Sequence, residues 1–116
     1  MDTLSRVRAL SWTLRSAVAA RHQLKRGRRL DAVVLPDPPS LPEDMTRTVR
    51  LVTRLLDNTC LERAIVLQRW YAAHGDRKSI WIGVSSPSAG FRAHAWLEGE
   101  TSGNETFEKL LKVDIQ

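Results

Sequence analysis

Apolar residues recur at helical spacing along the first part of the chain, with many arginines between them. This pattern predicts an amphipathic helix over about residues 3–25, which begins at Asp2 or Thr3 and ends at Gly27. The apolar side of this helix is expected to be formed by Leu4, Val7, Leu14 and Val18, with Leu10 beside them.

A connector without regular structure should follow this helix. Residues 30–35 suit either a short strand or an extended arm, and the run 36–42 holds four prolines in seven residues. Because proline is excluded from helix interiors and from central strands, we expect the second run to be extended.

Two further helices are predicted after the connector. The first should cover about residues 43–56, and the second should run from Cys60 to about His74. Residues 57–59 offer capping side chains for the second of these helices, and Gly75 should end it. The expected buried positions of the first are Met45, Val49, Val52 and Leu56.

Beyond Gly75 the apolar spacing changes to the period of two that is typical of strands. We predict strands over residues 80–85 and 91–98, a hairpin turn at Gly99-Glu100 and a weaker third strand after it. The chain should therefore be one α+β domain, with N-terminal helices followed by a small antiparallel sheet. Within it, residues 1–42 form the basic helix and connector, and residues 43–116 form the core.

Basic residues are concentrated at the start of the chain, although the net charge of the whole is only +5. Residues 1–30 hold eight basic side chains and one acidic one, whereas the other 86 residues hold ten bases and twelve acids. Such a segment should bind something acidic or anionic, unless it is simply a solvated face. The candidate binding residues are Arg21, Lys25, Arg26 and Arg28, to which we add Trp96.

The composition places the chain in a reducing compartment. Cys60 is the only cysteine, so no disulfide can form within the chain, and the cytoplasm is the expected location. We find neither the roughly 20 apolar residues of a bilayer span nor a signal-peptide core. Three histidines and one cysteine show no short ligand spacing, so we expect no metal and no cofactor.

Cys60 is the candidate nucleophile because it lies where a helix should begin. The positive end of the helix dipole and the unpaired backbone N–H groups there favour a thiolate. The same N–H groups could stabilise an oxyanion. A lone cysteine is more often a small buried apolar residue, so a second catalytic group is needed to support this role.

His94 supplies that second group. It lies between two alanines, which leaves room beside its ring for a thiol or a substrate. If Gly99-Glu100 is a two-residue turn, the next strand places Glu105 opposite His94, with their Cβ atoms about 5 Å apart. A carboxylate there would fix the tautomer of the imidazole, and a shifted turn would favour Asn104 instead.

Several features occur in order in the second half of the chain. A cysteine opens a helix with leucine next to it, an arginine follows, a strand ends in Gly-Val, and an Ala-His-Ala-Trp sequence comes later. These features, in residues 58–70, 82–84 and 91–98, closely resemble the transglutaminase-like leader peptidases of lasso-peptide biosynthesis. The likeness covers about half the chain, from Asn58 to roughly Leu110.

This resemblance implies a papain-like core with a Cys-His-acid triad, in which Cys60 and His94 take the first two places. The family's acid is usually an aspartate about a dozen residues after the histidine. Thr106 stands at that distance here, so Glu105 would have to serve. The implied reaction is removal of the leader from a ribosomally made lasso-peptide precursor. The implied partners are that precursor, a small leader-recognition protein and the ATP-dependent lasso cyclase, with no nucleic acid and no membrane.

Three alternatives remain open. The thioester could pass to an amine instead of water, which would make the chain a transglutaminase-like acyltransferase. A non-enzymatic nucleic-acid-binding module could be built on the basic helix, although only Trp12 supplies an aromatic ring there. An inactive scaffold would leave Cys60 resistant to alkylation.

Overall fold

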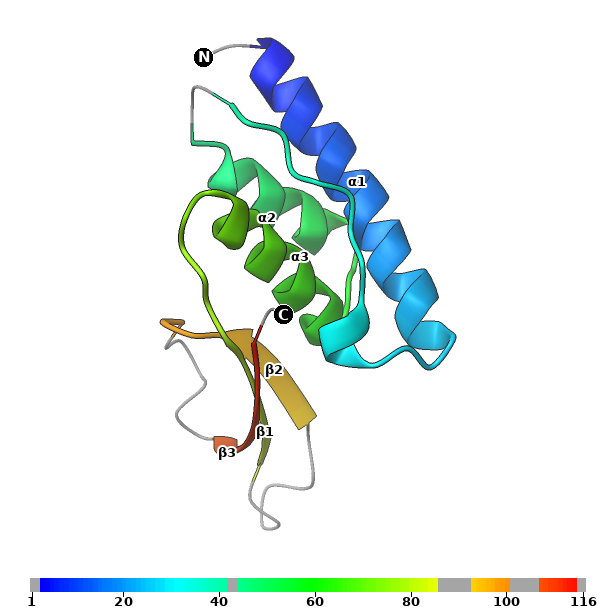
Figure 1. Ribbon diagram of the computed structural model, residues 1–116, viewed down its shortest axis with the longest axis vertical. Helices are drawn as coiled ribbons and strands as arrows, with labels where there is room; N and C mark the ends of the chain where they lie inside the picture. Colours follow the sequence, from blue (N-terminus) through cyan, green and yellow to red (C-terminus); the bar gives the residue numbers. More distant parts are fainter. Residues whose placement is uncertain (1–2, 42–43, 86–92, 101–106, 115–116) are drawn as a thin grey trace.

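The computed structural model describes residues 3–41, 44–85, 93–100 and 107–114, and over these the chain is α+β, as predicted. Figure 1 shows three α-helices grouped at one end of the molecule and a three-stranded antiparallel sheet at the other. In chain order the elements are α1 (Thr3–Lys25), the 3-10 helix η1 (Leu30–Ala32), α2 (Thr46–Leu55), α3 (Cys60–Ala73), β1 (Ile80–Ser85), β2 (Ala93–Leu97) and β3 (Phe107–Val113).

α1 has the predicted bounds, but it does not bury the predicted side. Leu4, Val7 and Val18 are 63%, 53% and 68% exposed. Small and polar residues line the buried side instead, around one large tryptophan: Ser5, Ala9, Trp12, Thr13, Ser16, Ala17 and Ala20. The buried hydroxyl of Thr13 donates to the carbonyl of Ala9 at 2.7 Å, which offsets the cost of burying it. The sequence prediction is wrong here because small residues let α1 approach α2 and α3 closely, a requirement that hydrophobicity does not encode.

α2 buries the side that the sequence predicts, and α3 has nearly the predicted bounds. Met45, just before α2, and Val49 within it are buried. α3 ends one residue before His74, and Gly75 follows with a φ of 85°, in the left-handed region where glycine is favoured. Within the described residues, no helix combines the length and the apolar character needed to cross a membrane.

The core lies around α3, which packs against both other α-helices and against the sheet. Its Trp70 meets Trp12 of α1 with ring centroids 5.3 Å apart, and both side chains are almost fully buried. The indole N–H of Trp70 donates to the hydroxyl of Thr46 in α2 at 2.9 Å. α3 is therefore held by all its neighbours, which fixes the position of its first residue, Cys60.

The connector is an arm that runs beside α1 (Figure 1). Of the two alternatives for residues 30–35, the strand is wrong, because η1 is followed by irregular backbone through residue 41. Trp12 donates its indole N–H to the carbonyl of Pro36 at 2.8 Å. The side-chain amide of Gln23 pairs with the backbone of Val34 at 2.7 and 2.9 Å, so the arm is held without regular structure.

The sheet has the order β2-β1-β3, with both pairs antiparallel. The predicted hairpin between β2 and β3 is wrong, because β1 lies between these strands. A turn does follow β2, since Gly99 has a φ of 93° and the N–H of Glu100 donates to Leu97 at 3.1 Å. β3 nevertheless pairs with the other edge of β1, where apolar residues face each other, as in the pair of Ile80 and Val113.

Candidate active site

Cys60 is the first residue of α3, and a capping box fixes this helix start. The hydroxyl of Thr59 accepts the backbone N–H of Glu62 at 3.1 Å, and the carboxylate of Glu62 accepts the N–H of Thr59 at 3.1 Å. These reciprocal bonds satisfy two of the backbone donors that a helix start leaves unpaired. Cys60 therefore lies at the positive end of the α3 dipole.

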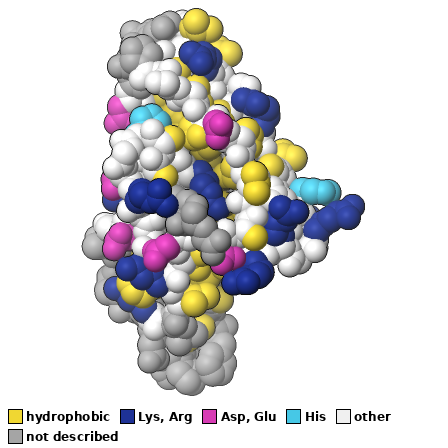
Figure 2. Space-filling model, in the orientation of Figure 1, with side chains coloured by type: hydrophobic (Ala, Val, Ile, Leu, Met, Phe, Trp, Pro, Cys, Tyr) yellow, Lys and Arg dark blue, Asp and Glu magenta, His cyan; other side chains and the backbone are white. Residues whose placement is uncertain are grey.

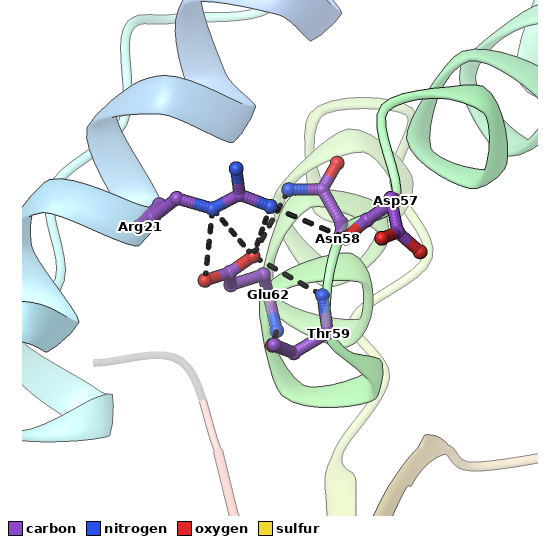
Figure 3. A network of polar contacts seen from close by, with 5 residues as sticks. All are labelled: Arg21, Asp57, Asn58, Thr59 and Glu62. Carbon is purple, nitrogen blue, oxygen red and sulfur yellow. Dashed lines mark hydrogen bonds and ion pairs between the residues drawn. The ribbon is translucent and has the colours of Figure 1, made fainter.

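Glu62 is also held by side chains from outside the helix, as Figure 3 shows. The Nε of Arg21 in α1 donates to both carboxylate oxygens at 3.2 and 3.4 Å, and Asn58 donates to one of them at 3.1 Å. Arg21 also donates to the carbonyl of Asp57 at 3.3 Å, so one guanidinium links α1 to both sides of the helix start. Burial alone would raise the pKa of Glu62, but hydrogen bonds from Asn58, Thr59 and Arg21 together lower it below its usual value.

β2 brings its backbone at Ala95 against this helix start. The backbone N–H of Ala95 donates to the sulfur of Cys60 at 3.4 Å. That nitrogen belongs to the peptide bond between His94 and Ala95, so the thiol lies against the backbone of the histidine's own strand. Among the described strands β2 is an edge strand, and α3 packs against it.

Two described residues, Gly83 and Trp96, shape the surroundings of His94. Gly83 of β1 is its cross-strand partner, so no side chain projects beside the ring from that position. The imidazole stacks on Trp96, with centroids 5.6 Å apart and planes 20° apart. The imidazole is partly exposed, which leaves it accessible to a substrate.

The third catalytic residue stays a prediction. Glu105 was placed opposite His94 by assuming that β2 and β3 pair, and the position opposite His94 is held by Gly83. The geometric argument for Glu105 is therefore wrong. Both Glu105 and the alternative Asn104 lie outside the described residues.

The predicted binding residues fall into three environments. Arg21 is engaged by Glu62, and its side chain is 40% exposed. Lys25, Arg26 and Arg28 are exposed at the end of α1. Trp96 is only 4% exposed, so its indole supports His94 and offers little surface to a partner.

The sequence analysis did not predict the network around Glu62, although the sequence does indicate its capping box. The sequence Thr59-Cys60-Leu61-Glu62 has the spacing of a capping box directly before an apolar run. Nothing local indicates Arg21, because it lies 41 positions from Glu62 along the chain. In the part of the chain that the structure describes, no three histidine, cysteine or acidic side chains come together as a metal site would require.

Comparison with known families identifies the superfamily of the chain. A model of the transglutaminase-like superfamily matches residues 3–112, almost the whole chain, so the chain belongs to that superfamily. Its membership indicates a cysteine hydrolase or acyltransferase. The curated proteins and the solved structures compared with the chain include no match.

Proposed function

We propose that the chain is a cysteine peptidase that removes the leader from a lasso-peptide precursor, with Cys60 as nucleophile and His94 as acid and base. One observation carries the proposal: the sulfur of Cys60, at a helix start, lies 3.4 Å from the backbone nitrogen that follows His94. The membership in the transglutaminase-like superfamily supports thioester chemistry at this position. The narrower assignment rests on the likeness of residues 58–70 and 91–98 to leader peptidases.

In the proposed reaction the thiolate of Cys60 adds to the carbonyl carbon of the bond between leader and core. Backbone N–H groups at the start of α3 supply hydrogen-bond donors to the oxyanion. The imidazolium of His94 gives its proton to the leaving amine of the core, the C–N bond breaks, and the leader stays on sulfur as a thioester. Water then attacks the thioester while His94 takes its proton, which releases the leader as a carboxylic acid and restores the thiol.

Mass spectrometry of a cognate precursor incubated with the protein and its leader-recognition partner tests this proposal. The wild type should release the leader acid and the free core, and both Cys60→Ala and His94→Ala should abolish cleavage. His74→Gln is the matched control, because His74 is an exposed histidine at the far end of α3. Cleavage that persists in Cys60→Ala would contradict the peptidase proposal. A leader joined to an added primary amine would support the acyltransferase instead.

Glu105 is the proposed third member of the triad. A carboxylate that holds His94 in one tautomer should contribute strongly to kcat, so Glu105→Gln should lower kcat by about two orders of magnitude or more. Asn104→Ala is the matched control and should leave kcat nearly unchanged. If Asn104→Ala lowers kcat and Glu105→Gln does not, Asn104 is the third member of the triad.

The proposed partners are the precursor, a small leader-recognition protein and the ATP-dependent cyclase that receives the core. Lys25, Arg26 and Arg28 are exposed and remain candidates for contact with an acidic leader or with the recognition protein. Reversing these three charges should weaken precursor capture in the presence of the recognition protein. If precursor capture is unchanged, Lys25, Arg26 and Arg28 do not contact the leader or the recognition protein.

A further inference from the structure

α1 carries an apolar stripe that the described part of the chain leaves largely exposed. Its members are Leu4, Val7, Leu10, Leu14 and Val18, and they are 63%, 53%, 40%, 38% and 68% exposed, respectively. At 3.6 residues per turn they lie on the opposite side of α1 from the buried residues that pack on α2 and α3. The aliphatic residues that sequence analysis predicts as core are therefore a surface.

The stripe has the spacing of a helix-pairing seam. Positions a and d of a heptad repeat alternate in steps of three and four residues, and in α1 they fall at Leu4, Val7, Ser11, Leu14 and Val18. All of these residues except Ser11 are apolar. From Leu4 to Val18 the seam is about 21 Å long, enough for two heptads of a partner helix. Next to its C-terminal end lies an open groove of about 490 Å³, lined by Leu14, Arg15, Val18, Ala19 and His22.

Basic side chains lie along one side of this seam, at a heptad position that helps to select the partner helix. Taking Leu4 as position a, Arg8 and Arg15 both occupy position e, where paired helices form interhelical ion pairs. No acidic residue occurs between Thr3 and Lys25. Figure 2 shows apolar side chains between basic ones along the side of the molecule that α1 forms.

We propose that the stripe Leu4–Val18 of α1 is a docking surface for an acidic amphipathic helix of another protein. In an antiparallel pair, a second copy of α1 would bring its own arginines against Arg8 and Arg15, and such like-charge contacts oppose pairing. In a parallel pair, position e faces position g of the partner, where a second copy has Leu10 and Ala17 and offers the arginines no opposite charge. A helix with glutamates beside its apolar seam meets both arginines with opposite charge. The surface lies on α1 alone, so the inference stands whether or not Cys60 cleaves a peptide.

A membrane surface fits the stripe less well. Helices that lie in the membrane interface commonly place aromatic residues among the apolar ones. The one aromatic residue of α1, Trp12, is fully buried and donates its indole N–H to Pro36. The exposed stripe is aliphatic throughout, as the seam of a helix pair usually is.

Fluorescence anisotropy with two labelled synthetic peptides tests the docking surface on the full chain. Both peptides contain three heptads with leucine at positions a and d, and one carries glutamate and the other lysine at positions e and g. Like charges keep each peptide from pairing with itself. The glutamate peptide should bind saturably with a Kd below about 0.1 mM. The lysine peptide should bind at least about tenfold more weakly.

Three variants make the test specific. Leu14→Ser with Val18→Ser should weaken binding of the glutamate peptide at least about tenfold. Arg8→Glu with Arg15→Glu should exchange the preference, so that the lysine peptide binds better. The matched control is Leu51→Ser with Leu55→Ser, which changes leucines 53% and 74% exposed on α2 and should leave binding unchanged. Circular dichroism of each variant reports that the fold is retained.

Four results would each overturn the proposal. They are the absence of saturable binding of the glutamate peptide, equal binding of both peptides, and binding that survives the changes at Leu14 and Val18. The fourth is competition for the stripe, seen as concentration-dependent dimerisation in sedimentation or as tighter binding to phosphatidylglycerol vesicles than to the peptide. Dimerisation would identify a second copy as the occupant, and vesicle binding would identify a membrane.

Discussion

Arg21→Ala removes the guanidinium that α1 places on the carboxylate of Glu62. This ion pair has an N–O distance of 3.2 Å, and the two side chains are 40% and 6% exposed. Exposed pairs contribute about 0.2–1 kcal/mol, whereas breaking a fully buried pair costs about 3–5 kcal/mol. Because Asn58 and the N–H of Thr59 still hold the carboxylate, we expect the variant to lose about 1.5 kcal/mol of unfolding free energy.

A double-mutant cycle isolates the interaction between the two side chains. Glu62→Gln keeps an oxygen that can accept the N–H of Thr59 while removing the charge. Urea unfolding of the wild type, both single variants and the double variant should give a coupling energy of about 1 kcal/mol. Arg15→Ala is the matched control, since Arg15 is an exposed arginine of the same helix, and should change stability by less than about 0.5 kcal/mol.

The same variants connect this contact to the reactivity of Cys60. The carboxylate of Glu62 lies two residues from Cys60 in the first turn of α3, and its negative charge opposes a thiolate there. Arg21 offsets that charge, so alkylation of Cys60 by iodoacetamide at pH 7 should slow severalfold in Arg21→Ala and recover in the double variant. The assay needs no precursor and no partner.

Two results would refute this reasoning. A coupling energy below about 0.4 kcal/mol, the usual error of additivity, would mean that the two side chains do not depend on each other. An alkylation rate that is unchanged in a folded Arg21→Ala variant would mean that the contact stabilises the fold without influencing the thiol.

Three further predictions concern stability and are all measured by urea unfolding. Because the pKa of Glu62 is lowered in the folded state, its carboxylate contributes stability above its unfolded pKa of about 4.3, and this contribution is lost as the pH falls through the folded pKa. Glu62→Gln should therefore show a flatter acid profile than the wild type, and parallel profiles would contradict this. Thr59→Ala should cost about 1 kcal/mol through the lost cap, and an unchanged midpoint would argue against the capping box. Gly75→Ala should also cost about 1 kcal/mol, because φ is 85° there although the added methyl group meets open space, and stabilisation would contradict the assigned strain.

The sequence was sufficient for elements whose signals are local. The start of α3 at Cys60 follows from the capping residues before it, and its end follows from Gly75. The alternation of residues 80–85 likewise predicts the bounds of β1. In each case a few neighbouring side chains determine the backbone conformation.

Two features failed because they depend on the packing of distant segments. α1 shows a clear aliphatic stripe, and the usual expectation is that such a stripe is buried. The fold instead buries Ala9, Ala20 and Trp12, because close contact with two helices requires small residues around one large side chain. The pairing of β3 with β1 is equally invisible locally, since consecutive strands are neighbours only about two-thirds of the time.

The candidate site depends both on local sequence signals and on the packing of distant segments. Cys60 and His94 were recognisable as chemistry-bearing residues, but the contact between the Cys60 sulfur and the backbone of Ala95 depends on α3 packing against the edge of β2. Arg21 was predicted as a partner-binding residue because its charge is visible in the sequence. Its contact with Glu62 is set by the packing of α1, and it gives this arginine a role within the fold.

The predicted boundary at residue 42 separates a basic region from the rest of the chain. We expect the two regions to fold together as one unit. α1 supplies Trp12 to the core, where it lies against Trp70, and Arg21 to the start of α3. Loss of one buried tryptophan costs about 3–5 kcal/mol, a large part of the 5–15 kcal/mol that stabilises a typical domain. A fragment of residues 43–116 should therefore show no cooperative urea transition in tryptophan fluorescence. A sigmoidal transition, together with alkylation of Cys60 at the rate of the full chain, would show that the core folds without α1 and that the contact from Arg21 is dispensable.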